Sequence, residues 1–186
     1  MEKAKKRIGV FIESDFYENE IFYYQLRFPE EGIDLQFYSR LWGQDALTFK
    51  GHEFGAPFYC QNDFQTLTDD DIDSFSAFIV PAGMVADRLR YTEDTSKLPP
   101  ASIFLKKLFE KKQILKGIIC HGLWLVSPVA EVIQGRKIVA HNNLIGDVKN
   151  YGAIYTDQDL VVDDDLITAR TGGHCNLLAR AIIDRI

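Results

Sequence analysis

Cysteine is scarce in this sequence. The three cysteines are Cys60, Cys120 and Cys175, an odd number with no short spacing between them. This pattern argues against a disulfide framework and against a paired-cysteine zinc site. No His, Cys or Asp cluster has metal-ligand spacing, and no Gly-x-Gly-x-x-Gly loop follows the first predicted strand. The sequence therefore predicts neither a metal nor an organic cofactor.

Long apolar runs and clustered positive charge are also missing. No segment approaches the roughly 20 apolar residues that span a bilayer. The first apolar segment is too short for a signal peptide and lacks a small-residue cleavage site. Lys and Arg number 21 against 27 Asp and Glu, and the basic residues are scattered, which disfavours binding to a phosphate backbone. We expect a cytoplasmic protein with free thiols that binds neither nucleic acid nor a membrane.

Strand patterns and helix patterns alternate along the chain. The composition is 46% hydrophobic and 26% charged, and residues 1–186 read as one domain. Short apolar or alternating runs predict strands at 7–12, 33–39, 76–81, 114–120 and 136–141, with three shorter ones near the end. Amphipathic patterns predict helices at 19–32, 101–112, 123–133, 144–152 and 174–186. This alternation predicts an α/β fold, a three-layer sandwich with a mostly parallel central sheet.

Chemically active residues follow three of the predicted strands. The stretches are ESDFYENE after the first strand, PAGMVADR after the third, and CHG after the fourth. In open parallel sheets, ligands bind beyond the carboxyl ends of the strands. We therefore expect carboxylates, backbone N–H groups beside glycine, and a thiol with a histidine to converge at one edge of the sheet.

Cys120 is the most informative residue of this group. At a tight turn from strand to helix its side chain is held outward, as in the nucleophile elbow of serine hydrolases. The positive end of the following helix favours a thiolate there. The alternative is a cysteine that acts as a small buried hydrophobe at the end of a core strand. The His-Gly that follows favours the nucleophile.

The stretch GIICHG resembles the nucleophile motif of the ThiJ/PfpI superfamily, which includes intracellular proteases and deglycases. The similarity continues in order along nearly the whole chain and is weakest at 40–66. It is carried by FYENEIFYYQLRFPEEGIDLQFYS, FIVPAGMVADRLR, IQGRKIVAHNNLIGDVKNYGA and VVDDDLITARTGG. The resemblance implies a flavodoxin-like fold, similar to that of class I glutamine amidotransferases.

The resemblance also implies roles for individual residues. Cys120 would be the nucleophile, and Glu20 the carboxyl that meets the thiol. A carboxyl buried beside a thiolate should have a raised pKa. The alternative for Glu20 is an acid in the first turn of a helix that merely favours the helix dipole. Glu18 is the near competitor, and the spacing of the motif favours Glu20.

His121 has two possible roles in the family. In PfpI-type proteases this residue is the base, and its carboxylate partner comes from a neighbouring subunit. The matching position is Asp87, where the family usually has Glu, so the resemblance implies a homodimer or larger homo-oligomer. Taken alone, Asp87 reads as a solvated loop residue. In the deglycase branch the working histidine follows the next strand, where His141 is the candidate. His52 and His174 read as surface or cap residues.

The oxyanion-binding groups would be the backbone N–H groups of Gly83 and His121. Two departures from the family bear on this site. Ala82 replaces a usual glycine, which is acceptable if the position does not need a positive φ. Leu123 and Trp124 follow the elbow where the family often has proline, and packing is the favoured role for Trp124.

These residues support a cysteine-dependent hydrolase or lyase of small carbonyl or amide compounds, such as peptides, glycated amines or methylglyoxal. A different class of function is a redox sensor whose low-pKa cysteine is oxidised. A glutamine amidotransferase subunit is the third reading, but it needs a His-x-Glu pair near the end of the chain. That region contains TGGHCN, without the acid.

Overall fold

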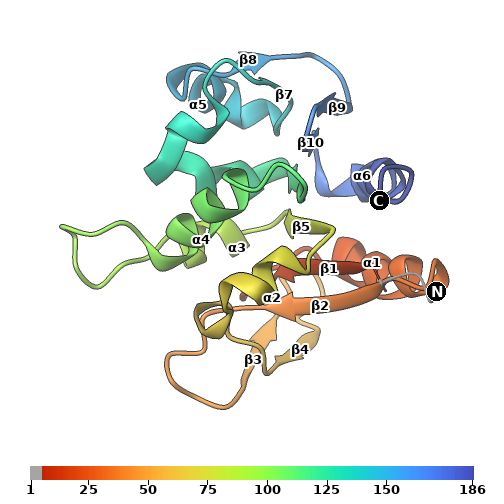
Figure 1. The fold of residues 1–186 in the computed structure, drawn as a ribbon, viewed down its shortest axis with the longest axis vertical. Helices are drawn as coiled ribbons and strands as arrows, with labels where there is room; N and C mark the ends of the chain where they lie inside the picture. Colours follow the sequence, from red (N-terminus) through yellow and green to blue (C-terminus); the bar gives the residue numbers. More distant parts are fainter. Residues whose placement is uncertain (1–5) are drawn as a thin grey trace.

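A six-stranded sheet forms the centre of the molecule in the computed structural model, which describes residues 6–186 (Figure 1). The strand order is β2-β1-β5-β6-β10-β9. All neighbouring strands are parallel except β9, which runs antiparallel to β10 at one edge. The strands are β1 (Arg7–Phe11), β2 (Asp34–Tyr38), β5 (Ala77–Val80), β6 (Leu115–Ile119), β9 (Leu160–Asp163) and β10 (Leu166–Ala169).

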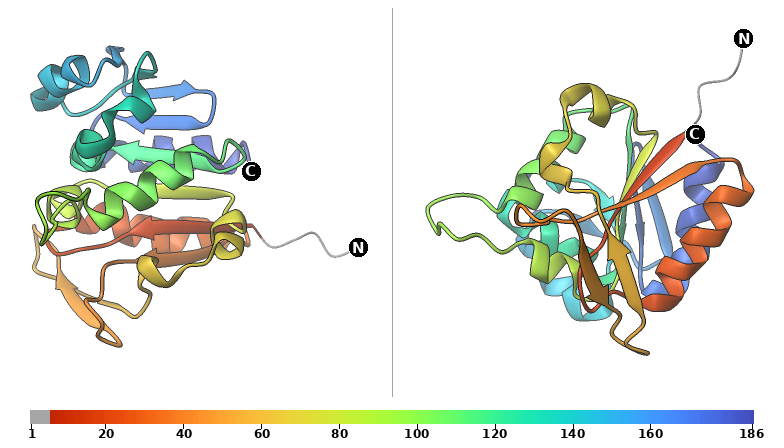
Figure 2. Two further views of the ribbon diagram at one scale, coloured as in Figure 1. Left: turned by 60° about the vertical axis from the view of Figure 1, so that its left-hand side comes forward. Right: turned by 90° about the horizontal axis from the view of Figure 1, so that it is seen from below.

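Helices cover both faces of this sheet, so the predicted three-layer α/β sandwich is confirmed. Helices α1 (Glu18–Glu30) and α6 (Cys175–Ile183) lie together on one face (Figure 2). The opposite face carries other helical segments. These are α2 (Asp69–Asp73), α3 (Val85–Leu89), α4 (Pro100–Phe109) and the 3₁₀ segment η2 (Cys120–Ile133).

The main strands form because they are apolar on both sides. Every residue of β5 is buried, as are four of the five residues of β1 and of β6. Burial on both faces is what a parallel sheet covered by two helical layers requires. Two helix termini follow from local sequence, since Gly32 lies just after α1 with φ +71° and Pro100 is the first residue of α4.

The structure corrects the prediction at four segments. Of the strand predicted at 136–141, only Lys137–Ile138 (β7) forms strand pairs, and its partner is β8 (Ile154–Tyr155) in a separate sheet. The pairing stops there because the N–H of the next residue, Val139, donates to Thr168 Oγ1 instead. Residues 123–133 belong to a 3₁₀ segment, with non-helical dihedral angles at Val129 directly after Pro128. The short helices α2 and α3 were not predicted.

The region 40–66, where the family resemblance is weakest, contains a hairpin. Strands β3 (Leu47–Lys50) and β4 (Pro57–Cys60) are antiparallel, and the short 3₁₀ helix η1 (Phe64–Thr66) follows them. Further on, the 3₁₀ turn η3 (Asn142–Leu144) leads into α5 (Ile145–Asn150), and η4 (Gly172–His174) leads into α6. The tip of the hairpin and the η4 turn both reach the candidate site.

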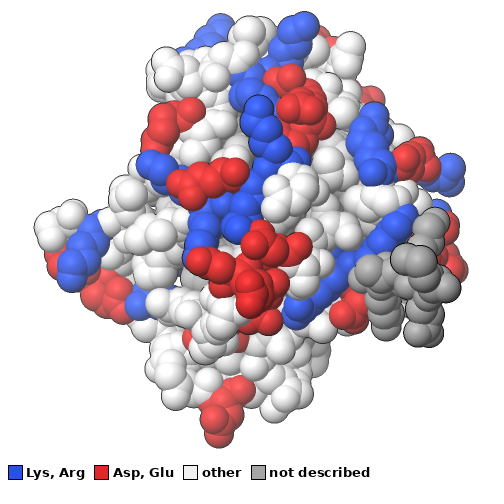
Figure 3. All heavy atoms as spheres, viewed as in Figure 1, with Lys and Arg blue, Asp and Glu red and all other residues white. Residues whose placement is uncertain are grey.

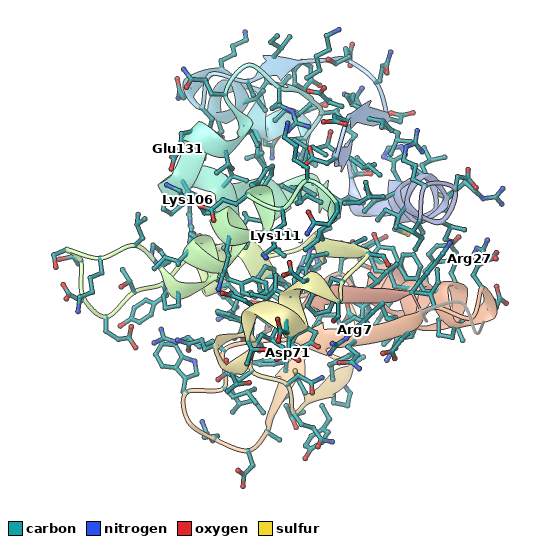
Figure 4. All side chains as sticks on the ribbon, in the orientation of Figure 1. Arg7, Arg27, Asp71, Lys106, Lys111 and Glu131 are labelled. Atoms are coloured by element: carbon teal, nitrogen blue, oxygen red, sulfur yellow. The ribbon has the colours of Figure 1, made fainter. Side chains whose placement is uncertain are left out.

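Charges of both signs are interspersed on the face shown in Figure 3. Many of them form ion pairs between elements. Figure 4 shows Lys106 of α4 beside Glu131 of η2, and their charged atoms are 2.7 Å apart. Among residues 6–186, no helix combines the length and apolar character that crossing a membrane requires.

A buried group of charges joins the amino ends of β6 and β10. Lys116 is fully buried and pairs with Asp165, which is 5% exposed. Arg136 donates to the same carboxylate at 2.8 Å. A buried charge is tolerated only when a partner compensates for the lost hydration. This cluster therefore favours one register of β6 against β10, and the lost hydration of its buried charges opposes that stabilisation.

Replacing Asp165 by Ala should destabilise the protein strongly. The buried ammonium of Lys116 loses its carboxylate, and we expect the free energy of unfolding to fall by about 3–5 kcal/mol in urea denaturation. The double variant Lys116→Met/Asp165→Ala should recover most of that loss. Asp157→Ala is the surface control: this side chain is 83% exposed beside Arg170, so the expected change is within about 1 kcal/mol. Equal losses in both single variants would contradict the prediction.

Candidate active site

Cys120 occupies a strained turn between β6 and η2. Its φ is +57°, in the left-handed region that residues with a side chain rarely adopt. Gly122 makes the turn possible, because a Cβ at this position would lie 2.6 Å from the carbonyl oxygen of Val80 on the neighbouring strand. The predicted nucleophile elbow is therefore present, and the close approach of η2 to β5 holds it.

His121 lies directly beside the thiol. Its Nδ1 is 3.2 Å from Cys120 Sγ. The imidazole packs against two rings, with centroids 4.8 Å from Trp124 and 4.7 Å from His141. Burial and the neighbouring His141 hold the pKa of His121 below its ordinary value of 6.5. A neutral imidazole, able to accept a proton, is therefore its state near neutral pH.

Glu20 is completely buried in the first turn of α1. Its Oε2 accepts a hydrogen bond from the backbone N–H of Ala82 at 2.8 Å, whereas Oε1 has no hydrogen-bond partner among residues 6–186. Burial raises the pKa of Glu20 to about 8, despite the opposing effects of the Ala82 N–H and the Tyr24 hydroxyl. The expected rise in pKa is confirmed, and the carboxyl is largely protonated at neutral pH.

The thiol of Cys120 does not match the expectation of a stabilised thiolate. Burial raises its pKa to about 11, and the negative charge of Glu20 adds to this rise. The backbone N–H groups of Gly172 and His121 act in the opposite direction but do not outweigh burial. The prediction considered the helix terminus and not the loss of hydration. At rest the site therefore holds a neutral thiol beside a neutral imidazole.

Glu18, the near competitor of Glu20, has a different task. It is also fully buried, but its carboxylate accepts hydrogen bonds from the N–H groups of Glu53 and Phe54, at 2.9 and 2.8 Å. Its burial raises the pKa, yet these N–H groups outweigh that effect and hold the pKa below its ordinary value. Glu18 therefore ties the tip of the β3–β4 hairpin to α1.

Gly83 lies at the end of the loop after β5. Its φ is +83°, and a Cβ there would lie 2.4 Å from the carbonyl oxygen of Asp15. A glycine is thus required at this position. The condition set for Ala82 is met, because Ala82 is not among the residues with positive φ. The backbone of Gly83 lines the same pocket as Cys120 and His121.

Asp87 is on α3 and not in a loop. Within the chain its carboxylate pairs with Arg90, Oδ1 accepting from Nε at 3.1 Å and from Nη2 at 2.6 Å. Hydrogen bonds between Asp87 and His121 are absent among the described residues. The guanidinium of Arg90 in turn lies 5.3 Å from the ring centroid of Trp124.

A pocket of about 470 Å³ opens over the thiol. Its lining includes Cys120, His121 and Gly83, as expected, and also His141. Tyr17, Ala82 and Met84 also line it, and they belong to two of the stretches expected at this edge. The sequence analysis did not anticipate the remaining lining residues, which are His52, Glu53, Thr171, Gly172 and Gly173. The TGG turn after the last parallel strand was the signal for three of them, since that strand ends at the same edge.

The four histidines divide into two groups. His121 and His141 stack at the pocket, and His141 Nδ1 also accepts from the N–H of Asn143, which caps η3. His174 caps the start of η4 through Thr171, so its prediction as a cap is confirmed. His52 is exposed, as predicted, yet it belongs to the pocket wall.

Residues 6–185 match the DJ-1/PfpI family. The chain belongs to this family. A relative, protein/nucleic acid deglycase 2 of Escherichia coli, is 32% identical over 167 residues, which cover 89% of each chain. Deglycase PfpI of Pyrococcus furiosus is 26% identical over 162 residues, 86% of this chain and 87% of the other.

Solved DJ-1/PfpI structures confirm the fold. Schizosaccharomyces pombe DJ-1 superposes with a TM-score of 0.80 at 19% identity, covering 97% of this chain and 91% of that one. A two-domain protein of Anabaena variabilis, with a DJ-1/ThiJ/PfpI-like and a ferritin-like domain, gives 0.83 at 23% identity. This chain is covered over 97% of its length and spans 48% of that protein. At these identities the structural likeness shows a shared fold and nothing beyond it.

The buried carboxyl of this DJ-1/PfpI chain should make its stability depend on pH. The pKa of Glu20 is higher in the folded protein than in the unfolded chain, so its contribution is fully present below 4.5 and is lost as the pH rises through about 8. Relative to Glu20→Gln, the wild type should lose up to about 1.4 kcal/mol of unfolding free energy per pH unit in this window. Urea denaturation across the window measures the difference.

Glu18→Gln is the matched control, two residues before Glu20 on the same turn. Its lowered pKa makes its contribution constant above 4.5 and lost only as the pH falls further. The difference between this variant and the wild type should thus stay level where that of Glu20→Gln changes. Parallel stability curves for wild type and Glu20→Gln would refute the assignment.

Proposed function

We propose that this protein is a cysteine-dependent hydrolase or lyase that acts on small carbonyl or amide compounds. One observation carries the proposal: a thiol on a strained elbow lies 3.2 Å from the Nδ1 of a neutral histidine at the floor of a pocket. A nucleophile within hydrogen-bond reach of a base is the arrangement that covalent catalysis requires. The relatives named deglycases support the same class of chemistry.

The first step forms a bond between sulfur and carbon. The thiol is neutral at rest, so the proton moves from Cys120 Sγ to Nδ1 of His121 while the sulfur attacks the carbonyl carbon. The carbonyl oxygen takes the electron pair of its broken π bond. Backbone N–H groups of Gly83 and His121 would hold that oxyanion, because amides fixed by the fold need no reorganisation as the charge develops.

The later steps depend on the substrate class. With an amide, the carbonyl forms again, the carbon–nitrogen bond breaks, and the His121 imidazolium gives its proton to the leaving nitrogen. Water then attacks the thioester, His121 accepts a proton from it, and the thiol is restored. With an aldehyde such as methylglyoxal, the first product is a hemithioacetal, and the protonated Glu20 is the nearby buried acid for the subsequent proton transfer.

The redox-sensor alternative gains no support from the geometry. A sensor cysteine is a low-pKa, accessible thiolate. Burial raises the pKa of Cys120 instead, and the residue is 8% exposed. A neutral thiol that loses its proton to a base during attack suits an enzyme better than a peroxide-reactive sensor.

Replacing Cys120 by Ala should abolish turnover. We expect methylglyoxal consumption, deglycation and peptide hydrolysis, whichever the wild type performs, to fall by at least about a thousandfold in kcat. His121→Ala should lower kcat by about a hundredfold or more, because general-base assistance is lost. Substrate loss is followed by chromatography under saturating conditions.

Cys60→Ser is the matched control for the thiol. Cys60 is buried in β4, where its Sγ–H donates to the carbonyl of Phe37 at 3.5 Å, and it is not part of the pocket lining. A hydroxyl can keep this hydrogen bond, so activity should remain within about threefold of the wild type. Turnover that persists in folded Cys120→Ala would overturn the proposed role of the thiol.

A further inference from the structure

We infer that Trp124 is a positioning residue for His121, and that Asp87 acts on the same histidine through Arg90 and Trp124 of its own chain. This inference rests on the proposed role of His121 as the base. It concerns residues outside the pocket lining, and it gives Asp87 a route to the site that needs no neighbouring subunit.

The imidazole of His121 contacts two rings, and we call this group of contacts the clamp. The indole of Trp124 meets it in an edge-to-face arrangement with an interplanar angle of 72°, and the ring of His141 is tilted against it by 36°. Because Trp124 is on the turn of η2 that follows His121, the clamp is built into the elbow itself. Edge-to-face pairs of this kind restrict the rotation of the smaller ring.

The indole of Trp124 is itself held by an ion pair between Asp87 of α3 and Arg90, the residue that follows this helix. Arg90 lies over the Trp124 ring, and Asp87 holds the guanidinium through two hydrogen bonds. α3 packs directly against η2 in the fold. A cation over an aromatic face and a carboxylate behind it form a continuous chain of contacts from α3 to the base.

The clamp sets the orientation of the His121 imidazole, and this orientation determines whether Nδ1 can accept the proton of the thiol. Among the described residues, the titratable groups that face His121 are Cys120, at 3.2 Å from Nδ1, and His141. A rotation of the imidazole about its side-chain bonds would take Nδ1 away from the sulfur. The clamp therefore keeps the proton acceptor aimed at the thiol before substrate arrives, which is the benefit of a preorganised base.

The chain contains an arrangement of the same kind away from the pocket. The guanidinium of Arg40 lies 3.7 Å from the ring centroid of Trp42 and pairs with Glu93 at 2.7 Å. This group repeats the carboxylate, guanidinium and indole of the clamp but has no histidine beside it. It therefore provides an internal control for the loss of a tryptophan and a cation–π contact.

The test follows alkylation of Cys120 by iodoacetamide, quantified by peptide mass spectrometry across the pH range in which His121 titrates. Trp124→Leu should slow alkylation by about tenfold near neutral pH and flatten its dependence on the ionisation of His121. Trp124→Phe keeps an aromatic ring at the contact and should stay within about threefold of the wild type. Trp42→Leu should leave both the rate and the pH profile unchanged.

A double-mutant analysis tests the part played by α3. Asp87→Asn and Arg90→Gln should each slow alkylation by about threefold in the wild-type background and have no effect in the Trp124→Leu background. An effect of Asp87→Asn that persists there, and that grows with protein concentration, would overturn the route within the chain in favour of contact between subunits. An unchanged pH profile in folded Trp124→Leu would overturn the clamp.

The probe needs no substrate, so two kinds of failure can be told apart. If His121→Ala leaves the alkylation profile of Cys120 unchanged, the proposed role of His121 as base is wrong. If His121→Ala changes the profile and Trp124→Leu does not, the base stands and the clamp is wrong.

Discussion

The close approach of η2 to β5 is the constraint on which the site depends. A glycine at 122 lets the chain pass close to the Val80 carbonyl, and two residues earlier Cys120 adopts a left-handed conformation. The strain is tolerated because β6 is buried on both faces and cannot shift. The thiol thus stands at the carboxyl edge of the sheet while its backbone remains part of the core.

That same burial determines the electrostatics of the site. The Glu20 carboxyl and the Cys120 thiol both lie where water is largely excluded, so each pKa is raised and both groups are neutral at rest. Neutrality avoids the cost of two adjacent buried anions. In the proposed reaction the first step is therefore a proton transfer, and His121, whose pKa is lowered, is the group beside the thiol that would accept the proton.

Sequence reasoning reached the topology and the place of the site for physical reasons. Buried strands read as apolar runs, and Cys120, Glu20 and Gly83 belong to stretches that follow three of these strands, so their convergence could be predicted. The choice of Glu20 over Glu18 came from the family resemblance. The raised pKa of the thiol could not be predicted, because the loss of hydration depends on how closely distant segments, such as the turn at Gly172, pack around the sulfur. The pairing of Asp87 with Arg90 was missed because α3 is five residues long and carries too little periodicity to predict.

The first turn of α1 carries two carboxyl groups in opposite states. Glu18 is ionised and anchors the hairpin tip at 53–54, whereas Glu20 is largely protonated and contacts the loop after β5. Glu18 holds this part of the pocket wall through backbone N–H groups, which every residue except proline can supply. The side chains of the tip take no part in this anchor. One short helical turn thus carries two separate tasks, the attachment of the pocket wall and the support of the loop that lines the pocket.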